Sequence, residues 1–142
     1  MKHLITTIFL LSTGNLFAQN TDSVPADPIY SFVEFSPEWK EGKEAMYAYL
    51  SANINYPKEA MTHCISGKVY LQFIVEKDGS INEDVKVLRG IGYGCDEEAL
   101  RVIKNMPAWN PGKQNGKPVR VYFNLPINFQ IPDCIPATPK DK

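Results

Sequence analysis

Apolar and polar residues alternate most regularly near the end of the chain, between residues 119 and 130. The apolar side of this pattern comprises Val119, Val121, Phe123, Leu125, Ile127 and Phe129. The opposite side comprises Arg120, Tyr122, Asn124, Asn128 and Gln130. A period of two residues is typical of a strand with one buried face. Pro126 lies inside this strand and cannot donate a backbone hydrogen bond, so we expect the strand at the edge of its sheet.

Two further strands are predicted at residues 68–76 and 81–88, where apolar residues again recur at every second position. Lys77-Asp78-Gly79 lies between them and is typical of a three-residue hairpin loop, with the glycine in the left-handed conformation. A slip by one residue would move every side chain to the other face, so the apolar pattern fixes the register. The pairs that this loop predicts are Val75 with Ile81, Leu71 with Val85, and Val69 with Val87.

Two segments have the periodicity of helices. Residues 41–53 carry apolar side chains at helical spacing and end before Tyr56-Pro57, because a residue before proline avoids the α conformation. Residues 96–106 begin with three acidic residues, which suit the positive end of a helix dipole. The order helix, strand, strand, helix, strand predicts an α+β fold with two helices packed on a three-stranded antiparallel sheet. The predicted spatial order of the strands is second, first, third.

The two ends of the chain differ in composition from its middle. Residues 1–18 combine a charged start, an apolar run and a small residue, Ala18, which is typical of a cleaved signal peptide. The alternative is that this segment stays in the membrane as an anchor. Residues 19–33 predict a flexible lead-in, residues 34–130 the folded domain, and residues 131–142 a disordered tail rich in proline.

Charge and candidate chemistry exclude several functional classes. Lys and Arg number 15 and Asp and Glu number 16, so no strong positive field favours nucleic acid as a partner. After cleavage His63 is the one remaining histidine, which argues against a metal site or a histidine-based catalytic triad. The glycines at 90, 92 and 94 lack the spacing of a nucleotide-binding loop, and acidic residues follow them. We therefore expect no cofactor, no small-molecule substrate and no enzymatic activity.

Three cysteines allow one internal disulfide in an exported protein. Extending the hairpin register places Cys64 across from residue 92 and thus close to Cys95. The last strand ends on the same side of the sheet, which also brings Cys134 near. We favour a disulfide between Cys64 and Cys95; a Cys64–Cys134 bond and three free thiols are the alternatives.

An ordered series of short motifs gives the chain a family resemblance. The motifs are Glu34-x-x-Pro37-Glu38-Trp39-x-x-Gly42, Tyr56-Pro57-x-x-Ala60, Phe73-x-Val75-x-Lys77-Asp78-Gly79, Val87-Leu88-Arg89-Gly90-Ile91-Gly92, Cys95-Asp96-Glu97-Glu98-Ala99, Met106-Pro107-x-Trp109 and the run from Pro111 to Val119. Together they resemble the C-terminal domain of TonB proteins, in particular the type found in Bacteroidetes. The resemblance covers residues 34–129 and implies the α+β fold predicted above.

The resemblance also implies a function. In this family the last strand receives the TonB-box peptide of an outer-membrane receptor, and the Tyr-Pro segment lies nearby. An exposed edge strand can accept a peptide as an additional strand. We therefore expect a periplasmic module that binds an outer-membrane TonB-dependent receptor or another envelope protein through Arg120, Tyr122, Asn124, Asn128, Gln130, Tyr56 and Pro57. The alternatives are an inner-membrane energy transducer with an uncleaved N-terminus and a homodimer formed through the edge strand.

Overall fold

A computed structural model describes residues 27–134 of the chain. The main sheet has the strand order β1-β6-β2-β3, and β2 pairs antiparallel with both β3 and β6. The strands are β1 (Ile29–Tyr30), β2 (Gly67–Val75), β3 (Lys86–Arg89) and β6 (Arg120–Phe129), with a small hairpin of β4 (Lys113–Gln114) and β5 (Lys117–Pro118). The predicted α+β class and the antiparallel order of the three long segments are confirmed.

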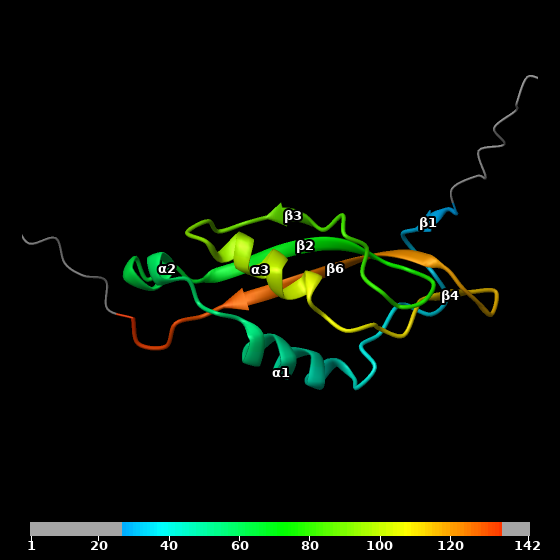
Figure 1. Ribbon diagram of the computed structural model, residues 1–142, viewed down its shortest axis with the longest axis horizontal. Helices are drawn as coiled ribbons and strands as arrows, with labels where there is room; N and C mark the ends of the chain where they lie inside the picture. The colour runs from blue at the N-terminus through cyan, green and yellow to red at the C-terminus, as the bar shows by residue number, and fades with distance from the viewer. Residues whose placement is uncertain (1–26, 135–142) are drawn as a thin grey trace, which may run out of the picture.

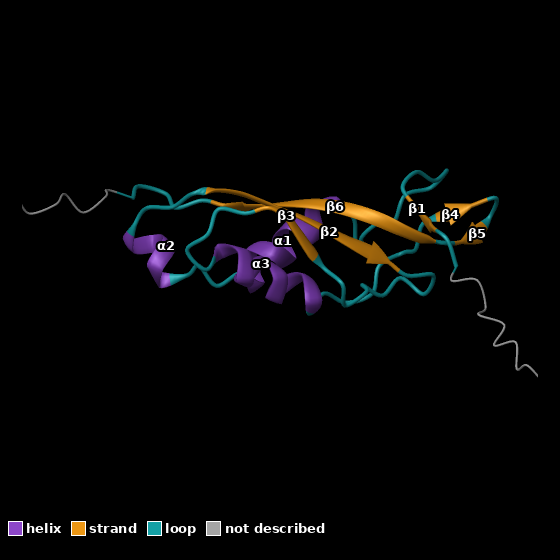
Figure 2. Cartoon of the chain, turned by 90° about the horizontal axis from the view of Figure 1, so that it is seen from above, coloured by secondary structure: helices purple, strands orange, loops and turns teal. Residues whose placement is uncertain are grey.

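The helices are α1 (Lys43–Asn53), α2 (Lys58–Thr62) and α3 (Cys95–Lys104). Figure 2 shows α3 beneath the sheet, and Figure 1 shows α1 beyond β6, on the side away from β2. The short helix α2 was not predicted. It starts directly after Pro57, whose φ of −62° suits the beginning of a helix, so the proline that ends one helical pattern also introduces the next helix.

Alternation along β2 and β6 builds the core. The odd-numbered residues of both strands point toward the helices, and their nine-residue antiparallel pairing runs from Gly67–Phe129 to Val75–Val121. The largest fully buried side chains include Trp109, Phe73, Phe129, Leu71 and Ile103. Because one face of each strand is apolar, a slip in this register would expose the core, and the alternation therefore sets the pairing.

The β2–β3 register differs from the prediction. The loop itself is as expected, since Gly79 has a φ of +86° and Val75 pairs with Ile81. Further along, Leu71 pairs with Val87 rather than Val85, and an irregularity follows between Tyr70 and Leu71. The inserted residues form a local turn in which Asn82 accepts a hydrogen bond from the backbone N–H of Asp84 and donates one to Glu76.

The cysteine pairing also differs. Cys64 forms a disulfide with Cys134, with a Cα–Cα distance of 5.6 Å, while Cys95 is buried and free. The favoured Cys64–Cys95 bond is therefore wrong. The shifted hairpin register no longer holds residue 92 opposite Cys64, and Cys95 opens α3 with its side chain in the core. Cys134 follows the end of β6, which lies opposite the start of β2, so it reaches Cys64 directly.

Parts of the two terminal segments are ordered. Ile29 and Tyr30, inside the predicted lead-in, pair parallel with Arg120 and Val121 of β6. Residues 131–134, inside the predicted tail, end in the disulfide-bonded Cys134. The predicted signal peptide, residues 1–18, lies outside the described residues. None of the helices within residues 27–134 has the length and apolar character needed to cross a membrane.

Candidate functional site

The outer edge of β6 is the first part of the candidate site. Pro126 lies opposite Tyr70 in the ladder with β2, and it has no N–H to donate. Its nitrogen must therefore face away from β2, and in a strand residues two apart share that orientation. The backbone groups of Tyr122, Asn124 and Asn128 consequently point outward. Within residues 27–134, β1 is the one strand paired with this edge, and it covers only Arg120 and Val121.

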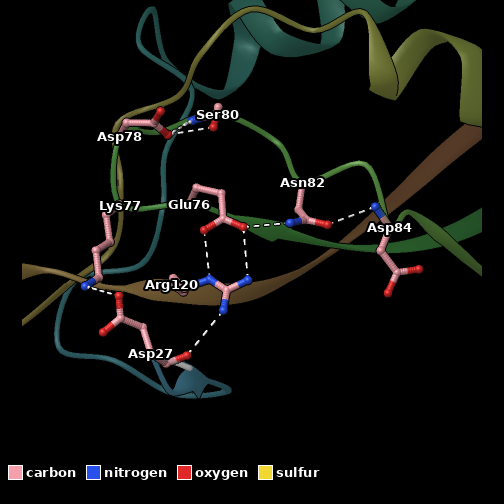
Figure 3. A network of polar contacts seen from close by, with 8 residues as sticks. All are labelled: Asp27, Glu76, Lys77, Asp78, Ser80, Asn82, Asp84 and Arg120. Atoms are coloured by element: carbon pink, nitrogen blue, oxygen red, sulfur yellow. Dashed lines mark hydrogen bonds and ion pairs between the residues drawn. The ribbon is translucent and has the colours of Figure 1, made fainter. Parts of the chain in front are cut away.

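A network of charged residues holds β1 in place (Figure 3). The Arg120 guanidinium donates to both carboxylate oxygens of Glu76, at 2.8 and 3.1 Å, and to the backbone carbonyl of Asp27 at 3.2 Å. Lys77 forms an ion pair with the Asp27 carboxylate at 2.5 Å. The hydrogen bond from Arg120 lowers the pKa of the Glu76 carboxyl, and the one from Lys77 lowers the pKa of Asp27.

This network separates Arg120 from the other predicted peptide-binding residues. Its guanidinium is engaged with Glu76, and its outward backbone lies beside β1, so it positions the start of the edge. The free part of the edge among the described residues extends from Tyr122 to Phe129.

A groove between α1 and β6 is the second part of the site. It consists of two cavities of about 450 and 500 Å³ that share Tyr47 and Pro126 in their walls. The first follows residues 126–130 of β6, and the second follows residues 123–126. Both therefore run along the free edge, on the sheet face that the helices cover.

The polar side chains predicted for peptide binding lie on the opposite face of the sheet. Asn124 accepts a hydrogen bond from Gln72 at 3.1 Å, and Asn128 donates one to Gln130 at 3.4 Å. Tyr122 is partly exposed on the same face, with 38% of its surface accessible. These residues come together along β6, and their outward backbone groups, more than their side chains, are placed for a partner strand.

Tyr56 forms the end wall of the first cavity. Its ring packs edge-on against Phe129 at 5.6 Å between centroids, and its hydroxyl donates to the carbonyl of Ile65 at 2.5 Å. Burial raises the pKa of this hydroxyl. Pro57 lies behind it, against Gly94, where an added Cβ would come within 3.1 Å of the proline ring. The structure thus places Tyr56 at the groove and Pro57 in the support behind it.

Sequence reasoning missed the wall opposite β6. Tyr47, Leu50 and Ser51 of α1 line the first cavity, and Trp39, Met46 and Trp109 line the second. The helical spacing identified Met46 and Leu50 as apolar, but it could not show that their helix lies beside the edge of β6. Among the described residues, no group of His, Cys, Asp and Glu side chains is arranged to bind a metal ion.

These features define a class: a small α+β domain whose last strand has an open edge beside a helix-lined groove. The chain matches the family described as Gram-negative bacterial TonB protein C-terminal over residues 52–131, more than half of its length, and it belongs to that family. The family is associated with TonB-dependent transport. The match begins within α1, so Trp39 and most of α1 precede it.

Two solved structures are similar to the chain. Both are NMR solution structures of the Helicobacter pylori TonB C-terminal domain. The form with residues 194–285 has 25% identity and a TM-score of 0.47, and the match covers 61% of this chain and 90% of that one. The form with residues 179–285 has 26% identity and a TM-score of 0.45, covering 61% and 77%. No curated protein matches the chain.

Proposed function

We propose that this domain is a periplasmic peptide-binding module that takes up a segment of an outer-membrane TonB-dependent receptor, or of another envelope protein, as an added strand on β6. The observation that carries the proposal is the open edge from Tyr122 to Phe129 beside the α1–β6 groove. No enzymatic step is part of this function. Family membership supports the link to transport.

The outward backbone groups of Tyr122, Asn124 and Asn128 would provide both donors and acceptors for a partner strand. Pro126 offers a carbonyl but no donor, so one hydrogen bond of a regular ladder is missing at the centre. Side chains of the partner that point toward the helices would enter the two cavities, because alternate residues of a strand face the same side. Main-chain pairing thus gives affinity and the cavities give selectivity.

Proline substitution separates the backbone contribution from that of the side chain. Tyr122→Pro removes an outward donor, whereas Tyr122→Ala removes the side chain and keeps the donor. We expect the proline variant to bind the partner peptide about tenfold more weakly than the alanine variant, because it loses a hydrogen bond and the fixed φ disturbs the ladder. Equal affinities of two folded variants would contradict strand addition.

The partner peptide itself can be identified by site-specific cross-linking in the native host. A photoreactive residue at Asn128 should cross-link to an envelope protein, and the same residue at Lys104, which is exposed on α3, should not. The cross-linked peptide then supplies the ligand for the Tyr122 titrations. A product consisting of two copies of this chain, with a dimer in light scattering, would instead support pairing of two β6 edges.

Periplasmic location and cleavage near Ala18 are tested together by intact mass and N-terminal sequence after cell fractionation. A processed chain in the periplasmic fraction supports the module. An unprocessed chain in the inner membrane would instead support an anchored energy transducer.

A further inference from the structure

Two tryptophans line the larger cavity of the groove. Trp39 is 8% exposed and Trp109 is 1% exposed, and their rings meet edge-to-face with centroids 5.7 Å apart. Met46, Phe123 and Leu125 complete the apolar part of the wall. This cavity of about 500 Å³ lies beside the middle of the free edge of β6.

Both indole groups have an unused hydrogen-bond donor. Nε1–H of Trp39 and Nε1–H of Trp109 are buried and have no acceptor among the described residues. Buried polar groups in proteins are nearly always paired, and an unpaired one calls for an explanation. Two such donors in the walls of one cavity form a pattern that suits a ligand carrying an acceptor.

Backbone contacts hold both tryptophans in position. The N–H of Trp109 donates to the carbonyl of Gly79 at 2.7 Å, and its ring packs edge-on against Phe73 and Phe123. Trp39 follows Glu38, which exchanges two backbone hydrogen bonds with Asn110, at 3.1 and 2.8 Å. The two indoles are therefore fixed before any ligand arrives, which favours binding by reducing the ordering cost.

The charges at the cavity favour an uncharged acceptor. Glu38 and Lys43 both line it and offset each other, and the Lys43 ammonium lies 5.9 Å from the centre of the Tyr47 ring. A carboxylate placed against the apolar wall would lose its hydration without gaining a dedicated cation. An amide oxygen has two lone pairs and can accept from neutral donors such as the indoles.

We propose that this cavity is an acceptor subsite, in which a Gln or Asn side chain of the partner strand accepts hydrogen bonds from Trp39 and Trp109. The inference rests on the proposed function, since the side chain enters from a strand added to β6. It deepens that function by giving the peptide a required residue at the level of Phe123–Leu125. Trp39 precedes the region of the family match, so this subsite uses a residue outside that region.

The two tryptophans make the test direct, because they are the only ones in the chain and give two indole N–H signals in a ¹H–¹⁵N spectrum. The probes are strand-forming peptides of alternating Thr and Val with one central guest residue. Gln and Met guests form a matched pair, since both are unbranched and only Gln carries an amide. A Glu guest tests charge, and N-methylacetamide tests the cavity without any strand.

We expect the Gln peptide to bind about tenfold more tightly than the Met and Glu peptides, as one or two added hydrogen bonds would give. At least one indole signal should shift and exchange more slowly with solvent. In Trp39→Phe, with the fold checked by circular dichroism, the preference should fall to about twofold or less, because one donor is lost. N-methylacetamide should shift the same indole signals.

The outcomes separate the subsite from the proposed function. Backbone signals of β6 that respond equally to Gln and Met peptides, with unmoved indoles, would retain strand addition and overturn the subsite. Tighter binding of the Glu peptide would overturn the uncharged acceptor. Indole shifts with N-methylacetamide, but no response of β6 to any peptide, would support the acceptor cavity and count against strand addition by these sequences. Silence of the indoles toward every probe would refute the subsite.

Discussion

The disulfide between Cys64 and Cys134 makes a quantitative prediction about stability. The bond closes a loop with a sequence separation of 70 residues, which contains β2, β3, α3 and β6. Chain-entropy theory gives a loss of denatured-state entropy for 70 residues that corresponds to about 4.4 kcal/mol at 25 °C. Measured effects are commonly lower, about 2–4 kcal/mol, because the reduced chain keeps some structure. We therefore expect reduction to lower the free energy of unfolding by about 2–4 kcal/mol.

The bond also supports one end of the groove. Cys64 immediately precedes Ile65, whose carbonyl accepts the hydrogen bond from Tyr56, and Cys134 follows the end of β6. The disulfide thus links the segment that carries the groove wall to the strand that forms the edge. Its loss should affect residues near Phe129 more than those near Tyr122.

Urea unfolding of the oxidised and reduced protein measures the global effect. The double variant Cys64→Ala/Cys134→Ala should resemble the reduced protein and should not respond to reductant. Cys95→Ala is the matched control: it removes the buried thiol, leaves the disulfide, and should keep the full response to reductant. Burial raises the pKa of the Cys95 thiol, so this group reacts slowly in the folded protein.

Thiol counting provides the result that would refute the reasoning. The oxidised chain, unfolded without reductant, should show one free thiol, and peptide mapping should place it at Cys95. Three free thiols would remove the disulfide altogether. A mapped Cys64–Cys95 bond would restore the hairpin-based pairing and contradict the observed end of β6.

Two further predictions concern the edge of β6. Arg120→Ala should speed amide exchange of Tyr30 in β1, because β1 loses a bond to its anchor, whereas Arg101→Ala on α3 should not. The pKa of Glu76 is lowered in the fold, so its contribution to stability is fully present above its unfolded pKa and is lost as the pH falls through the lowered value; the acid unfolding midpoint of Arg120→Ala should therefore shift less than expected from its stability at neutral pH. Pro126→Ala restores a donor at the centre of the edge and should tighten peptide binding about two- to tenfold by titration. Light scattering of this variant should also show more self-association, because the edge is less interrupted; weaker binding in a folded variant would contradict the outward orientation.

The main sheet could be predicted because its information is local. Period-two alternation along residues 68–76 and 119–130 fixes which side chains face the core, and Pro126 alone indicates the edge position. Both features depend on residues near one another in sequence. The pairing of β2 with β6 then follows from matching two apolar faces.

The hairpin register and the disulfide were lost for one shared reason. A turn at residues 82–84, stabilised by side-chain hydrogen bonds of Asn82, takes up residues that the pattern assigns to regular pairing. Alternation is unchanged by a shift of two residues, so parity alone did not distinguish Val85 from Val87 opposite Leu71. Every inference that extended this register, including the partner of Cys64, carried the same error.

The groove could not be predicted because its walls come from segments that meet only in the folded chain. Trp39, α1 and Trp109 lie far apart in sequence, and each has an apolar character that indicates nothing more than burial. Their shared cavity depends on α1 lying beyond β6 and on the pairing of Glu38 with Asn110. Sequence pattern identified the strand that offers backbone groups, whereas the tertiary fold determines which side chains could lie beside it.

The short strand β1 connects these two levels. It occupies the edge of β6 at Arg120 and Val121, so a partner strand on the same edge has to begin at or after Tyr122. The tryptophan-lined cavity starts at Phe123, one residue further along. The fold therefore limits the positions at which a partner can pair before any side chain is read, and the cavity next to that limit is the one with two unpaired donors. A position that is fixed by the backbone and a contact that is selective for a side chain thus meet at the same point of the strand.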